Sequence, residues 1–130
     1  AAALASLDLL RADASGAARA RLEAAHRRHL AAIAAHPRVR APRVLGTIAA
    51  FDLVPDAGAT RAGYLAPIGR ELAAYALAEG VLLRPLGDAC YLLPPYCTTD
   101  AELALAYGVI ERFLDGARVE TAGGGVLDDA

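Results

Sequence analysis

An arginine and a tyrosine in one apolar segment, Arg84 and Tyr91, are the residues whose types and spacing best suit a binding site. They lie in GVLLRPLGDACYLLPPY, residues 80–96. A guanidinium offers a fork of donors that matches the two oxygens of a carboxylate, and a phenol can border the same site. The same two side chains could instead form a structural cation–π or hydrogen-bonded pair. The local sequence leaves both interpretations open.

A predicted hairpin brings this pair together. Gly87-Asp88 is typical of a two-residue turn between the apolar runs Val81–Leu86 and Ala89–Leu93. In that register Arg84 lies directly opposite Tyr91, with the Cβ atoms about 5 Å apart. We therefore expect both side chains on one face of the hairpin.

The sequence offers little for covalent or nucleophilic catalysis. All 13 residues counted as Lys or Arg are Arg, so there is no Lys and no lysine imine can form within this chain. The two serines, Ser6 and Ser15, lie on or near the first predicted helix and do not support a serine triad. We expect no catalytic residue in this chain.

Histidines and cysteines give a weak metal-ligand pattern. His26 and His29 lie one helical turn apart in HRRH, with His36, Cys90 and Cys97 as further candidates. A metal needs three or four convergent ligands, and the HRRH pattern is more typical of a solvated helix face. Cys90 is expected in the core as a small apolar side chain. We expect no metal site.

Charge and hydropathy exclude several classes of function. The net charge is −2 with a pI near 5.9, and no basic stripe is present, so nucleic acid is not an expected partner. The apolar runs are short and interrupted, which argues against a membrane span. Two cysteines without a disulfide framework favour a reducing cytoplasm. The sequence contains no Met, even at position 1, and opens as if inside a helix, so we expect a fragment of a longer protein.

The elements in the first half follow from hydrophobic periodicity. Helices are predicted over residues 1–14 and 17–35, with Ser15-Gly16 as the stop between them. The apolar run 43–54 predicts one buried strand, and 55–63 predicts a loop.

The second half contains clearer boundaries. A third helix is predicted to begin at Pro67 and to end with Gly80 beyond its last turn. After the hairpin, Thr99 and Glu102 have the spacing of a capping box for a fourth helix, and the Gly-rich segment 117–130 predicts a flexible tail. The fold class is therefore α/β, of the α+β kind: a small, mostly antiparallel sheet with helices on one face.

Three segments together resemble a known family. GVLLRPLGDACYLLPPY, RVLGTIAAFDL and the opening AAALASLDLL are similar to the C-terminal part of adenosylmethionine–8-amino-7-oxononanoate aminotransferases. These belong to class III of the pyridoxal-phosphate aminotransferases, which have fold type I. The resemblance implies a C-terminal small domain over residues 1–116, with residues 1–35 as a helical lead-in from the large domain.

The resemblance also implies roles for residues of the hairpin. It assigns Arg84 to the carboxylate of the oxo-acid substrate and places Tyr91 and Leu86 in the same pocket, where the family often has an aromatic residue in place of Leu86. It implies pyridoxal phosphate as cofactor, S-adenosylmethionine as amino donor and 8-amino-7-oxononanoate as acceptor, giving 7,8-diaminononanoate for biotin. The cofactor lysine would belong to the large domain, so the fragment alone would be inactive; the full-length enzyme would be a homodimer.

Alternative functions remain open. The chain could be the small domain of another class III omega-aminotransferase. It could instead be a free-standing carboxylate-binding module that uses Arg84 and Tyr91, or a structural module that contributes dimer contacts.

Overall fold

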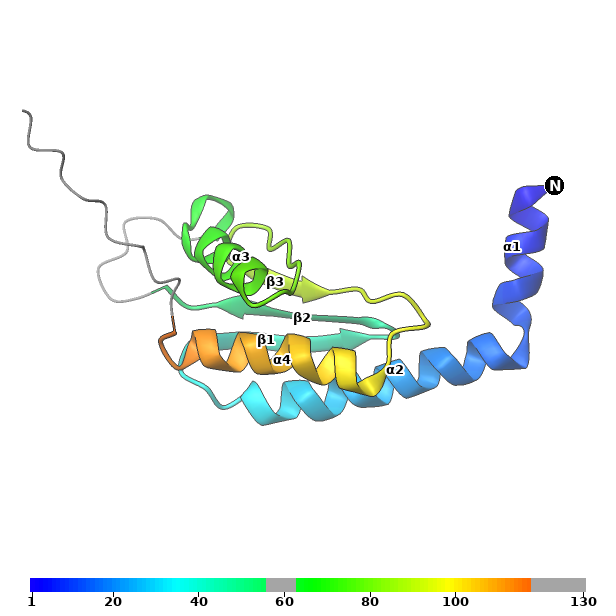
Figure 1. Ribbon diagram of the computed structural model, residues 1–130, viewed down its shortest axis with the longest axis horizontal. Coiled ribbons are helices and arrows are strands. Elements are labelled where there is room, and N and C mark those ends of the chain that lie inside the picture. The colour runs from blue at the N-terminus through cyan, green and yellow to red at the C-terminus, as the bar shows by residue number, and fades with distance from the viewer. Residues whose placement is uncertain (56–62, 118–130) are drawn as a thin grey trace, which may run out of the picture.

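The helices and strands lie within residues 1–55 and 63–117, the parts of the chain that the computed structural model describes (Figure 1). In chain order they are α1 (Ala2–Arg11), α2 (Asp13–Ile33), β1 (Val39–Leu45), β2 (Ile48–Leu53), the 3-10 helix η1 (Gly63–Leu65), α3 (Ile68–Ala78), β3 (Ala89–Leu92) and α4 (Asp100–Leu114). The tail predicted over 117–130 lies outside the described residues except for Ala117, and so does most of the loop predicted over 55–63.

The three strands form one antiparallel sheet in the order β1-β2-β3. Along β2 and β3 buried residues alternate with more exposed ones, so one face of the sheet is covered and the other is open. Helices α2 and α4 lie side by side against the covered face, and α3 packs against α4 (Figure 1). The predicted fold class, a small antiparallel sheet with helices on one face, is confirmed.

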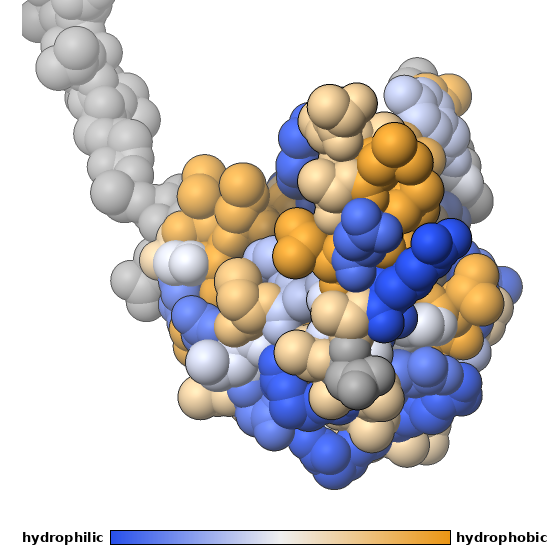
Figure 2. Space-filling view, turned by 90° about the vertical axis from the view of Figure 1, so that its right-hand side faces the viewer, coloured by the Kyte–Doolittle hydropathy of each residue, from blue (hydrophilic) through white to orange (hydrophobic). Residues whose placement is uncertain are grey.

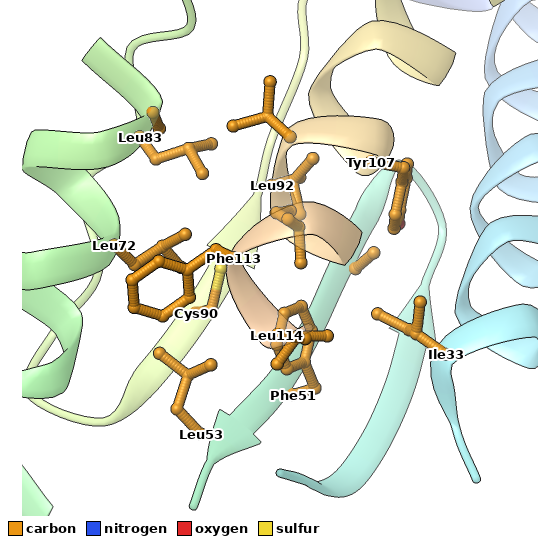
Figure 3. Close-up of a cluster of buried hydrophobic side chains, with 14 of the residues drawn as sticks. Ile33, Phe51, Leu53, Leu72, Leu83, Cys90, Leu92, Tyr107, Phe113 and Leu114 are labelled. Atoms are coloured by element: carbon orange, nitrogen blue, oxygen red, sulfur yellow. The ribbon is translucent and has the colours of Figure 1, made fainter. Parts of the chain in front are cut away.

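The core lies between the covered face of the sheet and the helices (Figure 3). Burial of one large apolar side chain stabilises the fold by about 1.5–3 kcal/mol. The labelled core residues are Phe51, Leu53, Cys90 and Leu92 from the sheet, Ile33 from α2, Leu72 from α3, Tyr107, Phe113 and Leu114 from α4, and Leu83 from the segment before β3.

The run 43–54, predicted as one strand, is a hairpin and this prediction was wrong. The chain reverses at Gly46-Thr47, and Leu45 pairs with Ile48. Gly46 has a φ of 55°, a conformation that glycine adopts without a steric penalty. The apolar residues on both sides of the turn form one uninterrupted hydrophobic pattern, which is why periodicity alone merged two strands.

The predicted hairpin with its turn at Gly87-Asp88 closes but does not extend. Leu86 and Ala89 exchange hydrogen bonds of 2.8 and 3.1 Å across the turn, and beyond them residues 81–85 leave the ladder. The amide of Val81 donates to the carbonyl of Ala76 at 2.7 Å, so this arm begins fixed to the end of α3. Strand β3 instead pairs with β2, with Ala50 opposite Tyr91. The predicted ladder pairing of Arg84 with Tyr91 is therefore wrong.

The helices agree better with prediction. Helix α3 ends before Gly80, whose φ is 81°, and α4 begins with the predicted capping box of Thr99 and Glu102. The break between the first two helices was misplaced. It falls at Ala12, which is extended, while Ser15 lies inside α2 and its hydroxyl donates to the carbonyl of Leu9 at 2.7 Å.

Candidate functional site

A pocket of about 430 Å³ opens where the two arms of the second hairpin diverge. One wall is the segment 81–84, the opposite wall is the end of β3 with residues 93–95, and the first turns of α4 close the back. Its lining residues are Val81, Leu82, Leu83, Arg84, Tyr91, Leu92, Leu93, Pro94, Pro95, Thr98, Glu102, Leu103 and Ala106.

Arg84 and Tyr91 both line this pocket. Leu83 is buried in the core and Arg84 is exposed, while Cys90 is buried and Tyr91 is 42% exposed. The in–out alternation of each arm therefore turns both side chains away from the core, and both residues line the pocket although the ladder between the arms is open. Among the described residues, Arg84 has no hydrogen-bond or salt-bridge partner.

A second charged group in the lining, Glu102, is already engaged. Its carboxylate accepts hydrogen bonds from the Thr99 backbone amide at 2.8 Å and from the Thr99 hydroxyl at 2.9 Å. These hydrogen bonds lower the pKa of Glu102. Glu102 thus stays ionised as part of the α4 cap, and Arg84 supplies the positive charge that is free for a ligand.

Leu86 lies apart from the other two candidate residues. It lines a separate pocket of about 290 Å³ together with Arg70, Pro85 and Tyr64 and Leu65 of η1. Leu86 forms the closing pair of the turn with Ala89, and Arg84 lies beyond the end of this pairing. The structure therefore brings Arg84 and Tyr91 together and leaves Leu86 outside their pocket.

Thr98, just before α4, and Leu103 and Ala106 of α4 had no local signal in the sequence that would place them at the pocket. These residues reach the site because α4 packs across the sheet, which is a long-range contact. Pro94 and Pro95, which follow β3, also line the pocket.

The histidines do not form a metal site within residues 1–55 and 63–117, where no three potential ligands come together. His26 is fully buried, so a solvated helix face was the wrong interpretation for it. Its Nδ1 lies 2.8 Å from the Tyr107 hydroxyl, and the His29 ring stacks on Tyr107 with centroids 4.6 Å apart. Cys90 is buried as expected, and burial raises the pKa of its thiol to about 12.

Within the described ranges, no helix is both long and apolar enough to cross a membrane.

Comparison with known proteins shows which protein family this chain is similar to. The model of the family described as aminotransferase class-III matches residues 1–114. An adenosylmethionine-8-amino-7-oxononanoate aminotransferase of Synechococcus elongatus is 50% identical over 115 residues, covering 88% of this chain and 26% of that protein. The chain thus spans about a quarter of the length of this curated relative.

Solved transaminase structures share the fold. The structure of a transaminase with L-Ala has a TM-score of 0.72 at 25% identity, over 87% of this chain and 27% of that one. The omega transaminase of Pseudomonas jessenii in complex with PMP has a TM-score of 0.64 at 29% identity, over 75% of this chain and 22% of that one.

Proposed function

This chain belongs to the class-III aminotransferases, and from that membership we propose that it forms the substrate-carboxylate wall of such an enzyme. Residues 1–116 are the C-terminal small domain in this proposal. The reaction of the whole enzyme is transfer of the amino group of S-adenosylmethionine to 8-amino-7-oxononanoate, which gives 7,8-diaminononanoate. The name of the Synechococcus elongatus relative supports this substrate pair.

The unpaired guanidinium of Arg84 in the pocket carries the proposal. The lining is largely apolar, and an arginine there is matched by a ligand with a carboxylate at one end and an aliphatic body. Tyr91 borders the same pocket and can donate a hydrogen bond to a carboxylate oxygen. Leu86, on the neighbouring pocket, contributes to the site at most as an outer apolar contact in the complete enzyme.

The cofactor is pyridoxal phosphate, in line with the PMP complex of the Pseudomonas jessenii transaminase. When bound, pyridoxal phosphate withdraws electrons from the reacting carbon and carries the amino group between substrates. The residues of this chain do not fit its covalent attachment, because the sequence has no Lys. This chain holds the acceptor carboxylate and orients the acceptor; no covalent step is assigned to it, and it is inactive alone.

Partners follow from the same proposal. The chain requires the large domain of the enzyme, and the complete enzyme is a cytoplasmic homodimer. Cys90 and Cys97 are both free thiols, which suits a reducing compartment.

The test is an assay of the full-length protein with pyridoxal phosphate. Mass spectrometry should detect 7,8-diaminononanoate when S-adenosylmethionine and 8-amino-7-oxononanoate are supplied. Product from other amines and oxo-acids, but not from this pair, would identify another omega-aminotransferase, the alternative favoured by the similarity to the Pseudomonas jessenii enzyme. Absence of amino transfer with every pair would reject the proposal.

A further inference from the structure

One wall of the Arg84 pocket has no partner strand to hold it. Residues 93–99 connect β3 to α4, and Pro94, Pro95 and Thr98 of this connection line the pocket. Figure 1 shows the connection running past the end of the sheet before it returns to α4. Its internal backbone hydrogen bond is that of a turn, from the Thr98 amide to the Pro95 carbonyl at 3.0 Å.

A guanidinium from α2 holds this connection. Arg21 Nη2 donates to the Thr98 carbonyl at 2.6 Å and to the Tyr96 carbonyl at 3.5 Å. Arg21 Nη1 donates to the Asp100 carboxylate at 2.5 Å, at the first residue of α4. One side chain, 77 residues from Thr98 in sequence, therefore joins the turn and the start of the helix behind the pocket.

The backbone that carries Arg21 is itself fixed. Leu22 and Ala25, on the adjoining turn of α2, are buried in the core. The planar fork of arginine can serve carbonyl and carboxylate oxygens at once, whereas the ammonium of a lysine is a single point of donation. The Thr99–Glu102 capping box fixes the start of α4 but makes no contact with the carbonyls of Tyr96 or Thr98.

We propose that Arg21 is a positioning residue for the acceptor: through the carbonyls of Tyr96 and Thr98 it holds the Pro94–Thr98 wall at the distance from Arg84 that fits the acceptor. This inference rests on the proposed function of the Arg84 pocket. Arg21 acts through the wall and touches no reacting atom, so its loss changes the affinity for the acceptor and leaves the chemical step intact.

The experiment uses the full-length enzyme with Arg21→Met, Arg21→Lys and the control Arg27→Met. Arg27 lies on the same helix and forms a comparable ion pair with Glu23 at 2.6 Å, away from the pocket lining. We expect Arg21→Met to raise KM for the oxo-acid about threefold to tenfold, a change in the range of lost charged hydrogen bonds at a partly exposed site. The value of kcat and the KM of the amino donor should stay within about twofold.

The conservative variant sharpens the test. Arg21→Lys should retain the Asp100 ion pair, lose the second branch of the fork and give an intermediate KM. Arg27→Met should match the wild type. An active enzyme in which Arg21→Met leaves the acceptor KM unchanged, or raises it no more than Arg27→Met does, overturns this inference and leaves the proposed function standing. A wild-type enzyme without amino transfer overturns the proposed function, and the inference with it.

If Arg21→Met is too unstable to assay, Asp100→Asn serves as the second variant. It removes the charge of the ion pair but leaves the Thr98 carbonyl bond, so the acceptor KM should rise less than in Arg21→Lys. A larger rise would contradict the role given to the turn carbonyls.

Discussion

At the scale of single residues, His26 shows how burial determines protonation. It is fully buried beneath α4, with Nδ1 2.8 Å from the Tyr107 hydroxyl. Desolvation lowers the pKa of His26, the nearby His29 lowers it further, and a backbone group of Thr47 acts in the opposite direction. His26 is therefore neutral when folded, and it serves the packing of α2 against α4.

This shift predicts a pH dependence of stability. Because the pKa of His26 is lower in the folded chain than its unfolded value of about 6.5, the unfolded chain binds more protons as the pH falls through that value. The contribution of neutral His26 to the free energy of unfolding should be complete above about pH 7. The free energy of unfolding should decrease as the pH falls below about 6.5. Urea denaturation followed by circular dichroism measures it.

The variants separate the two histidines. His26→Leu should lower stability above about pH 7 by about 1–3 kcal/mol, because the Tyr107 hydroxyl loses its partner, and this difference from the wild type should shrink below pH 6.5, where the decline is flattened. His29, whose pKa is also lowered chiefly by burial, contributes in the same direction, so His29→Gln should flatten it only in part. An undiminished decline in His26→Leu would contradict this account.

The Arg84–Tyr91 pair shows what the sequence can and cannot predict at this scale. Strand alternation correctly placed both side chains opposite the core, because Leu83 and Cys90 beside them are buried. It could not show that the arms part after Leu86, since that depends on the contact of the first arm with α3. The side chains therefore share a pocket instead of a ladder position.

At the scale of elements, the close contact of α3 with the turn before β3 fixes the arm that carries Arg84. A Cβ on Gly69 would lie 1.9 Å from the carbonyl oxygen of Gly87 and 3.0 Å from Cβ of Pro85. A backbone oxygen cannot rotate away as the end of a long side chain can. Gly69 is therefore required by packing and not by helix geometry.

We predict that Gly69→Ala destabilises the protein by about 1–3 kcal/mol through overpacking, despite the better helix propensity of alanine. The matched control is Gly108→Ala in α4, where the nearest atom to the added Cβ is the end of Arg112 at 3.7 Å. That variant should be neutral or more stable by up to about 1 kcal/mol. Urea midpoints that move in the same direction for both variants would contradict the predicted difference.

The elements also differ in how well sequence predicts them. Helices α3 and α4 carry local signals, a glycine beyond the end of one and a capping box at the start of the other, and both formed where expected. The β1–β2 turn carries Gly46 without a second turn residue, so its signal was lost in an apolar run. Strand pairing is set by contacts between residues far apart in sequence. Strand β3 accordingly pairs with β2 and not with residues 81–85.

At the scale of the whole molecule, α1 projects from the body and buries none of its residues (Figure 1). The end of the molecule on that side shows hydrophobic surface among charged side chains (Figure 2). Exposed leucines of α1 are Leu4, Leu7, Leu9 and Leu10. Because a ten-residue helix is marginal alone, we expect a partner to cover this surface.

We predict that this chain alone self-associates through α1. Sedimentation velocity should show a concentration-dependent increase in mass, and Leu4→Gln with Leu9→Gln should shift the chain toward monomer. Leu105→Gln on α4, which removes a leucine that is 53% exposed, should leave the association unchanged. A wild-type chain that stays strictly monomeric over a broad concentration range would contradict the prediction that α1 mediates self-association.

The most direct test of the account is whether Arg84 recognises the carboxylate of the acceptor. In the full-length enzyme, kcat/KM is measured for the oxo-acid and for its neutral amide, with wild type and Arg84→Ala. The wild type should prefer the acid by about 2–4 kcal/mol, roughly 30-fold to 1000-fold, and Arg84→Ala should abolish most of that preference. The half-reaction with the amino donor should change much less. An acid preference that survives in Arg84→Ala, or equal losses in both half-reactions, would contradict the assignment of Arg84 as the carboxylate anchor.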